Sequence, residues 1–282
     1  MRLRPAECNL DRAKIRSTRP RGDPNVAPMA TTPVSTAASP ATGAQPQPMF
    51  YRRLVPLTAA RHSALSLAPV VEYGFAREAK AIPLVTAEFG AAIRHYPIVF
   101  AARPTIPVAL VGIDTGGNLF VDPGGKWLEG AHIPGYVRRY PFILVPTPGT
   151  DDFVLGIDEA ARVLAPGEEN GLFRDGRPTA ALDRALAFCR DYQASVATTR
   201  QFCEALEAEG LLVDKEADIE LKSGRRTRLT GFRVVDEARF NKLPGKTFLA
   251  FRQRGWLHPI YLHLVASQNW ATLVDLAAPR LG

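Results

Sequence analysis

The chain has 282 residues, 46% of them hydrophobic and 22% charged, a globular composition that can supply a sizeable core. No uninterrupted apolar run approaches the roughly 20 residues that a membrane-spanning helix needs, which excludes a transport pore. The net charge of +7 is uneven, because residues 1–48 carry seven Lys or Arg against three acidic residues and the remainder is only mildly basic. This distribution argues against nucleic-acid binding.

Residues 1–48 carry no pattern of a folded element. They are rich in arginine at the start and rich in Ala, Thr, Ser and Pro from Ala27 to Pro48, with neither strand alternation nor a helical period. They also lack the apolar core of a secretory signal, from which we expect a cytoplasmic protein. The sequence therefore predicts a disordered extension over residues 1–48 and one domain over residues 49–282.

The first half of this domain predicts short strands separated by turns. Residues 79–93 combine a short extended piece with a helical stretch. Apolar segments bounded by turn residues predict strands at 96–100, 108–113, 118–121, 141–145 and 153–157.

The second half changes to a helical period. Apolar residues at 182, 186, 189, 196, 203 and 206 predict one long amphipathic helix or two in succession, ending near Gly210. A β-hairpin with a basic tip is predicted around Ser223-Gly224, and further helices at 237–243 and 259–276. The fold class is therefore α+β, with a strand-rich N-terminal half and a helical C-terminal half in one domain.

Two of the three cysteines fall on the predicted long helix. Cys189 and Cys203 are 14 positions apart, a separation of about 21 Å at 1.5 Å per residue. Because a disulfide needs Cα atoms within about 7 Å, we expect two buried thiols and no bridge between them.

Short motifs for chemistry are weak. Asp114-Thr115-Gly116 after an apolar segment has the form used by aspartic proteases, but a second copy is missing and a strand followed by a turn is the simpler interpretation. His258 and His263 do not have a metal-binding spacing, and we expect a structural, hydrogen-bonded role for His263. No phosphate loop or nucleophile motif occurs, so the sequence predicts neither a metal nor a cofactor.

The densest group of polar and aromatic residues runs from Tyr136 to Phe142. Arg138 and Arg139 in this run are able to grip a carboxylate or phosphate while the aromatic rings stack beside it. The alternative is an edge strand in which Arg138 is buried and paired with Asp122, Asp158 or Glu159 while Arg139 stays exposed. The candidate residues for binding a ligand or partner are Trp127, Tyr136, Arg138, Arg139 and Asp158.

Several segments in the same order and spacing resemble the SapC family of bacterial proteins, over about residues 49 to 276. They are Glu88-Phe89, His95 to Phe100, Pro107 to Leu110, Asn118 to Asp122, Gly125 to Trp127, Ile133 to Phe142, Gly156 to Glu159, Leu172-Phe173, Thr199 with Phe202, Leu211-Leu212, Leu229 to Phe232, Val235 to Glu237, and Tyr261 to Leu264 with Ser267. The family takes its name from a bacterial surface-array locus, so the resemblance implies a link to surface-layer assembly or export. A peptide-transporter permease shares the name, but this sequence lacks the spans of a permease.

Two functions remain open from the sequence. The first is a soluble, non-enzymatic accessory or binding protein with a protein or peptide partner, linked to surface-layer or envelope processes. The second is an enzyme or peptide-modifying partner whose site uses the five candidate residues. A deep pocket shared by those side chains would favour the enzyme, and a flat surface the binding protein. Neither function involves nucleic acid or membrane insertion.

Overall fold

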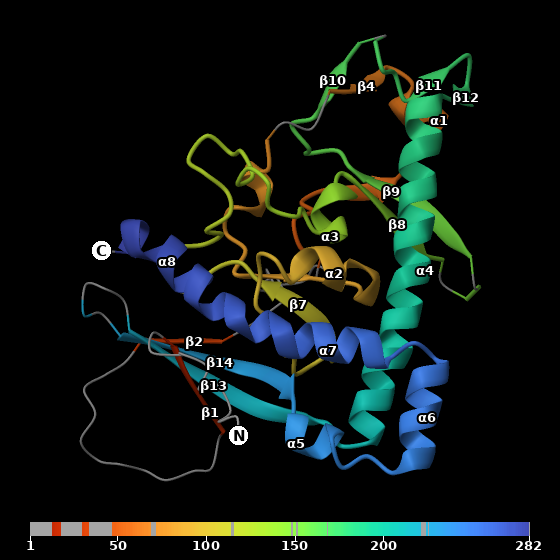
Figure 1. Ribbon diagram of the computed structural model, residues 1–282. Helices are drawn as coiled ribbons and strands as arrows, with labels where there is room; N and C mark the ends of the chain where they lie inside the picture. Colours follow the sequence, from red (N-terminus) through yellow and green to blue (C-terminus); the bar gives the residue numbers. More distant parts are fainter. Residues whose placement is uncertain are drawn as a thin grey trace.

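The computed structural model describes residues 13–17, 30–33, 47–68, 72–113, 116–147, 149–150, 152–167, 169–220, 224 and 226–281 of the chain (Figure 1). Asp114 and Thr115 of the protease-like string lie outside the described residues. So do Ser223 and Arg225 of the predicted basic hairpin tip.

The largest sheet has seven strands and combines both halves of the chain. Its order is β1-β13-β14-β6-β7-β5, and β2 pairs with β14 in parallel. Antiparallel pairing of β14 with β6, with Phe232 opposite Ala101, joins the late hairpin to the early strands. The strands are β1 (Ala13–Ser17), β2 (Ala30–Pro33), β5 (Ala81–Pro83), β6 (Ile98–Ala101), β7 (Pro107–Leu110), β13 (Leu212–Glu220) and β14 (Arg226–Val235).

Two strands of this sheet lie within residues 1–48, where the sequence predicts no regular element. Strand β1 runs antiparallel to β13, with Ala13 opposite Ile219, and β2 runs parallel to β14. Both strands pair through their backbones with the β13–β14 hairpin, in which side chains alternate between the two faces of the sheet. Residues 1–12, 18–29 and 34–46 lie outside the described part of the chain.

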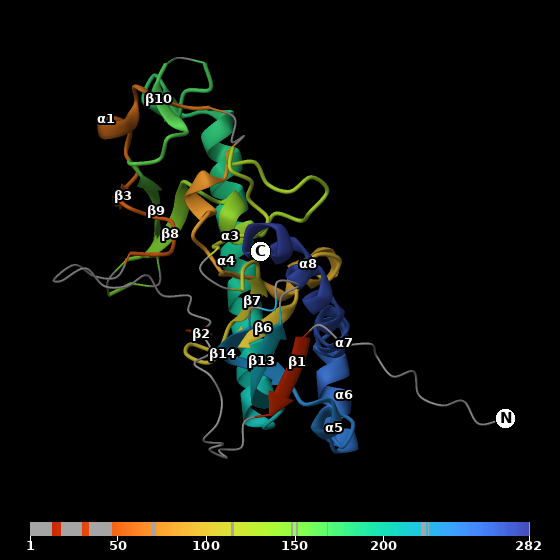
Figure 2. The same ribbon diagram turned by 90° about the vertical axis from the view of Figure 1, so that its left-hand side faces the viewer.

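Three smaller sheets belong to the first half and the region that follows it. They are β3 (Leu54–Pro56), β9 (Phe153–Asp158) and β8 (Phe142–Pro146) in that order, β4 (Leu65–Leu67) with β10 (Leu164–Pro166), and β11 (Phe173–Arg174) with β12 (Arg177–Pro178). Figures 1 and 2 both place β10 at the opposite end of the molecule from helices α5 and α6.

One long helix, α4 (Ala180–Ala208), runs along the molecule beside these sheets (Figure 1). The other helices are α1 (Ala59–His62), α2 (Phe89–Ala92), α3 (Gly135–Arg138), α5 (Glu237–Phe240), α6 (Gly245–Gln253), α7 (Leu257–Ala266) and α8 (Trp270–Leu281), with 3-10 turns at Gly74–Ala76, Thr86–Glu88 and Ser267–Asn269. Within the described residues, every helix is too short or too polar to cross a membrane.

The buried side chains form one main core and smaller clusters around it. The main core fills the space between the seven-stranded sheet and helices α7 and α8, where Trp270 and Phe232 are about 99% buried. A second cluster packs Phe100 and Phe202 against Trp256, and a third packs Phe142 against the upper part of α4. Helix α4 contributes to both of these clusters, so it connects the two ends of the molecule.

The predicted α+β class, with a strand-rich first half and helices later, is confirmed. The predicted strand at 118–121 is wrong, because Asn118 Oδ1 accepts the backbone N–H of Phe120 at 2.9 Å and bends the chain into a turn. The predicted helix at 259–276 is two helices separated by a 3-10 turn. In that turn Asn269 donates its side-chain amide to the carbonyl of Tyr96 at 2.9 Å.

Candidate functional site

Helix α3 lies where the sequence predicts an edge strand, and this changes the assignment of the two arginines. Pro134 precedes the helix and starts a single turn, Gly135–Arg138, and the strand begins only at Phe142. Neighbouring residues on a helix point about 100° apart rather than to opposite sides. The buried arginine is Arg139, which is 9% exposed, whereas the side chain of Arg138 is 45% exposed. The prediction that Arg138 is the buried one is therefore wrong.

Arg139 lies among three tyrosine rings. Its guanidinium carbon is 3.9 Å from the ring centre of Tyr136, 5.1 Å from that of Tyr192 and 5.9 Å from that of Tyr51. Burial raises the pKa of all three tyrosines and the charge of Arg139 opposes that rise, so the rings stay neutral phenols. Within the described residues no ion pair joins Arg139 to a carboxylate, and its Nε lacks a hydrogen-bond partner. Cation–π attraction is thus its main compensation.

Arg138 contacts a different carboxylate from those the sequence suggests. Its Nη2 lies 3.6 Å from Oε1 of the buried Glu88, and its Nε donates to the carbonyl of Ile133 at 3.0 Å. The same Glu88 oxygen accepts the backbone N–H of Gly135 at 2.6 Å and lies 3.0 Å from Nε2 of His132. Glu88 therefore anchors the start of α3. Sequence reasoning placed it in a family segment without assigning it a role.

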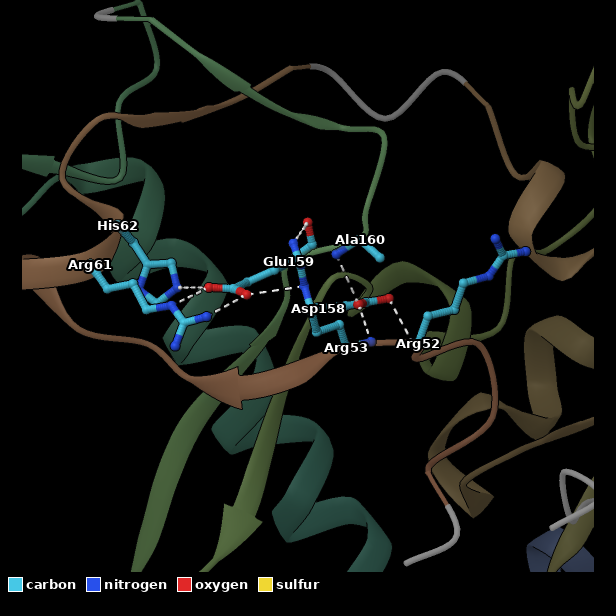
Figure 3. A network of polar contacts seen from close by, with 7 residues as sticks. All are labelled: Arg52, Arg53, Arg61, His62, Asp158, Glu159 and Ala160. Atoms are coloured by element: carbon cyan, nitrogen blue, oxygen red, sulfur yellow. Dashed lines mark hydrogen bonds and ion pairs between the residues drawn. The ribbon is translucent and has the colours of Figure 1, made fainter. Parts of the chain in front are cut away.

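Asp158 is completely buried, and four donors satisfy its carboxylate. Figure 3 shows the three that are backbone N–H groups. Oδ1 accepts the backbone N–H groups of Arg53 at 2.8 Å and Ala160 at 3.1 Å. Oδ2 accepts the backbone N–H of Arg52 at 3.1 Å and the hydroxyl of Tyr140 at 3.0 Å. Burial and the neighbouring Asp158 charge raise the pKa of Tyr140. Asp158 therefore fastens the segment before β3 to the end of β9 and pairs with neither predicted arginine.

Glu159 makes a second set of contacts beside this one (Figure 3). Its carboxylate lies 3.1 Å from Nε of Arg53 and 3.3 Å from Nε2 of the buried His62, and it also pairs with Arg61. Desolvation works to raise the pKa of Glu159, but the hydrogen bond and charge of Arg61 with the charge of Arg53 outweigh it and lower that pKa. The pair Asp158-Glu159 thus holds two different parts of the preceding chain.

Trp127 is buried in the main core rather than beside the arginines. Its Nε1 donates to the hydroxyl of Tyr96 at 3.2 Å, and its ring meets Tyr73 edge-on at 5.6 Å. The structure therefore does not bring the five predicted site residues together in one site, and only Tyr136 and Arg139 contact each other directly among the pairs described above. Each of the others is held by internal partners.

A groove lies elsewhere, between the β8–β9 hairpin and α4, and none of the five predicted residues lines it. We call it the hairpin groove. Its volume is about 420 Å³, and its lining residues are Leu144, Asp152, Phe153, Leu155, Leu186 and Arg190. Figure 1 shows the hairpin lying against the side of α4.

Strand geometry explains how the hairpin groove acquires its apolar lining. Leu144 is directly opposite Leu155 across the ladder, and Phe153 lies two residues before Leu155, hence on the same face. Phe153 and its neighbour Val154 remain 44% and 42% exposed. Sequence reasoning missed this site, although an apolar strand with two exposed large side chains is a signal for contact with something outside the chain.

Three helical side chains that could serve as a nucleophile or base, Cys189, Cys203 and His263, are buried. Burial raises the pKa of the free thiols Cys189 and Cys203 to about 11 and about 12. Nε2 of His263 accepts the backbone N–H of Val235 at 3.0 Å, which confirms its structural role, and burial lowers its pKa to about 4. Among the residues described, no three His, Cys, Asp or Glu side chains are grouped so as to hold a metal ion.

Comparison with known proteins yields one family. A family model described as SapC matches residues 57–273, most of the chain. The search of curated proteins finds no match. The search of solved structures finds no match either.

Proposed function

The chain belongs to the SapC family, and we propose that it is a binding or accessory protein that holds a peptide or protein partner in the hairpin groove. The observation that carries this proposal is the groove itself. Four of its six lining residues are apolar, and Phe153 stands 44% exposed at its edge. An apolar wall that stays open to solvent gains stability when a partner covers it.

The charged rim of the groove suggests the chemistry of the partner. Asp152 and Arg190 are both exposed and add one charge of each sign to an otherwise apolar wall. This combination suits a segment that inserts one or two apolar side chains and carries polar or charged groups beside them. We therefore expect a short peptide segment rather than a small polar metabolite.

The rival function, an enzyme with its site around α3, has less support. Asp158 would have to act as a charged or proton-transferring group, but its oxygens already accept four hydrogen bonds. Glu88 likewise accepts a backbone N–H from Gly135 and contacts His132. Groups committed to internal partners are poor candidates for acid–base chemistry unless those partners move.

We further propose that the partner belongs to surface-layer or envelope assembly, and that the two proteins meet in the cytoplasm. The family name supports the first part of this proposal. The second part agrees with the two cysteines on α4, which are free thiols as expected in a reducing compartment.

The test is partner capture with a matched pair of variants. The full chain, Phe153→Ser and Leu128→Ser serve as bait in a lysate of the native organism, and captured proteins are identified by mass spectrometry. Leu128 is the control, because it is also 44% exposed but lies outside the groove. We expect the wild type and Leu128→Ser to capture the same partner and Phe153→Ser to lose at least about tenfold of it.

The purified partner is then titrated by calorimetry into the wild type, Phe153→Ser and Leu128→Ser. Equal affinity for all three proteins would show that the groove is not the site. Failure of the wild type to capture any protein above the level of an unrelated bait would remove the binding function itself.

A further inference from the structure

The helices at the C-terminal end carry a charge distribution unlike the rest of the chain. Residues 238–274 contain no Asp or Glu, yet they contain five Lys or Arg, all exposed: Arg239, Lys242, Lys246, Arg252 and Arg254. Residues 1–48 contribute +4 of the chain's +7, so these five cations leave the remaining residues with a net negative charge. The positive charge of the folded body is therefore concentrated here.

Most of these cations are not used inside the protein. Arg239 pairs with Asp236 at 3.4 Å, and Arg254 stacks on the ring of Trp256 at 4.8 Å. In the described part of the chain, Lys242, Lys246 and Arg252 have no carboxylate within ion-pair distance. Three free cations on one short stretch repel one another, and an external anionic surface would relieve that repulsion.

Exposed apolar side chains accompany the cations. Leu249, Tyr261 and Val265 are 54%, 50% and 48% exposed, which makes them half of the exposed large hydrophobic residues in the described part of the chain. On α6, Leu249 lies three positions from both Lys246 and Arg252, so all three share one face. The buried Phe251 points to the core on the other side of the helix.

The position of α6 leaves this face accessible. Figures 1 and 2 place α5 and α6 at the end of the molecule away from β10 and α1. We call the exposed cationic and apolar residues of α6 and its neighbours the α6 face: Lys242, Lys246, Leu249, Arg252, Arg254, Tyr261 and Val265.

We propose that the α6 face docks reversibly on an anionic lipid bilayer. Leu249 would enter the boundary between headgroups and acyl chains, while the flanking cations contact lipid phosphates and carboxylates. An exposed aliphatic residue between Lys and Arg, in a stretch of sequence without Asp or Glu, is the composition of interfacial helices. An acidic protein would match the charge equally well but would not require an aliphatic residue at the centre of the cations. This surface is separate from the hairpin groove, so the proposal does not depend on the proposed function.

Vesicle sedimentation tests the proposal with the full chain. The probes are vesicles of phosphatidylcholine alone and vesicles that also contain phosphatidylglycerol. We expect binding only to the second kind, and we expect about 0.5 M salt to abolish it, because screening shortens the range of the attraction. The double variant Lys246→Glu/Arg252→Glu should lower the partition coefficient at least about 20-fold, and Leu249→Ser about fivefold.

The control has the same net charge as the double variant. Arg174 and Arg177 are exposed and lie opposite each other on β11 and β12, so Arg174→Glu/Arg177→Glu removes an equal amount of positive charge at another surface. We expect it to change partitioning less than about twofold. Circular dichroism checks that each variant is folded.

Three outcomes would overturn the proposal. The first is no binding of the wild type to either kind of vesicle, as expected if the α6 face serves an acidic protein. The second is an equal loss in the α6 and control variants, which would indicate net charge alone. The third is binding that survives the charge reversal, which would place the membrane contact in residues 1–48.

Discussion

Two arginine–aromatic pairs show how differently the same residue types act in this protein. Arg139 lies 3.9 Å from the ring centre of Tyr136 at 9% exposure, and Arg254 lies 4.8 Å from that of Trp256 on an exposed turn. The first pair is enclosed by two further tyrosines and holds α3 in place. In the second pair the Trp256 ring is buried, but the Arg254 side chain is exposed. Both pairs join an arginine to an aromatic ring close to it in the sequence, and they differ in whether the arginine itself is buried.

The Asp158 contacts provide the strongest test of the buried region. Asp158→Ala leaves three backbone N–H groups and the Tyr140 hydroxyl without their acceptor, and we expect a loss of about 4 kcal/mol in the free energy of unfolding. Urea unfolding followed by fluorescence measures it. Glu204→Ala is the control, because Glu204 is 61% exposed and pairs on the surface of α4 with the exposed Arg200, so it should cost under about 1 kcal/mol. Equal losses would mean that burial does not distinguish the two acids.

Arg139→Ala comes next in size. The substitution leaves a cavity among three tyrosines and removes the cation–π attraction, for an expected loss of about 3 kcal/mol in unfolding free energy. Arg139→Met should recover part of this loss, because it refills the volume without a buried charge. Arg138→Ala should cost less than about 1 kcal/mol, since that side chain is 45% exposed. A larger effect at Arg138 than at Arg139 would reverse the assignment made from α3.

The pH dependence of stability tests the burial of His263 on α7. The pKa of His263 is about 4 in the folded protein and about 6.5 when unfolded, so the unfolded state takes up the proton first as the pH falls. The contribution of the neutral His263 imidazole to the free energy of unfolding is fully present above about pH 6.5. It is lost as the pH falls toward about 4, and the free energy of unfolding is lower by about 2 kcal/mol near pH 5.

Urea midpoints measured across that pH range, for the wild type and for His263→Gln, isolate this contribution. Gln has no titrating group, so the variant should lose the part of the slope that belongs to position 263, whatever its absolute stability. An unchanged slope would show that other groups cause the acid sensitivity.

The smallest expected effect belongs to the exposed pair. Arg254→Ala should change the unfolding free energy by no more than about 0.5 kcal/mol, because the Arg254 guanidinium is exposed and water weakens its cation–π contact with Trp256. Thermal unfolding of Arg254→Ala, measured together with Arg139→Ala, compares the contributions of the two arginines directly. A loss of several degrees would mean that Arg254 is structural and not part of a free surface.

Local patterns predicted the long elements and failed where tertiary contacts decide. The spacing of apolar residues predicted α4, and the turn residues at Ser223-Gly224 predicted the β13–β14 hairpin. Alternation in the run from Tyr136 to Phe142 predicted a strand, but Pro134 and the acceptance of the Gly135 N–H by Glu88 start a helical turn instead. Glu88 is 47 residues away from Gly135, so no local pattern contains this contact.

The candidate sites divide in the same way. Tyr136 and Arg139 were singled out from the sequence, but their contact depends on the helical turn α3, where the sequence predicted a strand. The hairpin groove combines residues 144, 152–155 and 186–190, which only the packing of β8 and β9 against α4 brings together. The acid-free stretch 238–274 is visible in the sequence, but its significance depends on knowing that Leu249 is exposed.

The Asp158 contacts also have a consequence for how the protein is made on the ribosome. Asp158 binds the backbone of Arg52 and Arg53, which were synthesised 106 and 105 residues earlier. At about 5–20 residues per second, the start of the domain waits on the order of ten seconds for its acceptor to emerge. During that interval Phe50 and Tyr51, which later pack against Phe75 and Tyr140, are available to non-native contacts. The emerging chain is therefore most in need of a chaperone between the synthesis of β3 and that of Ala160.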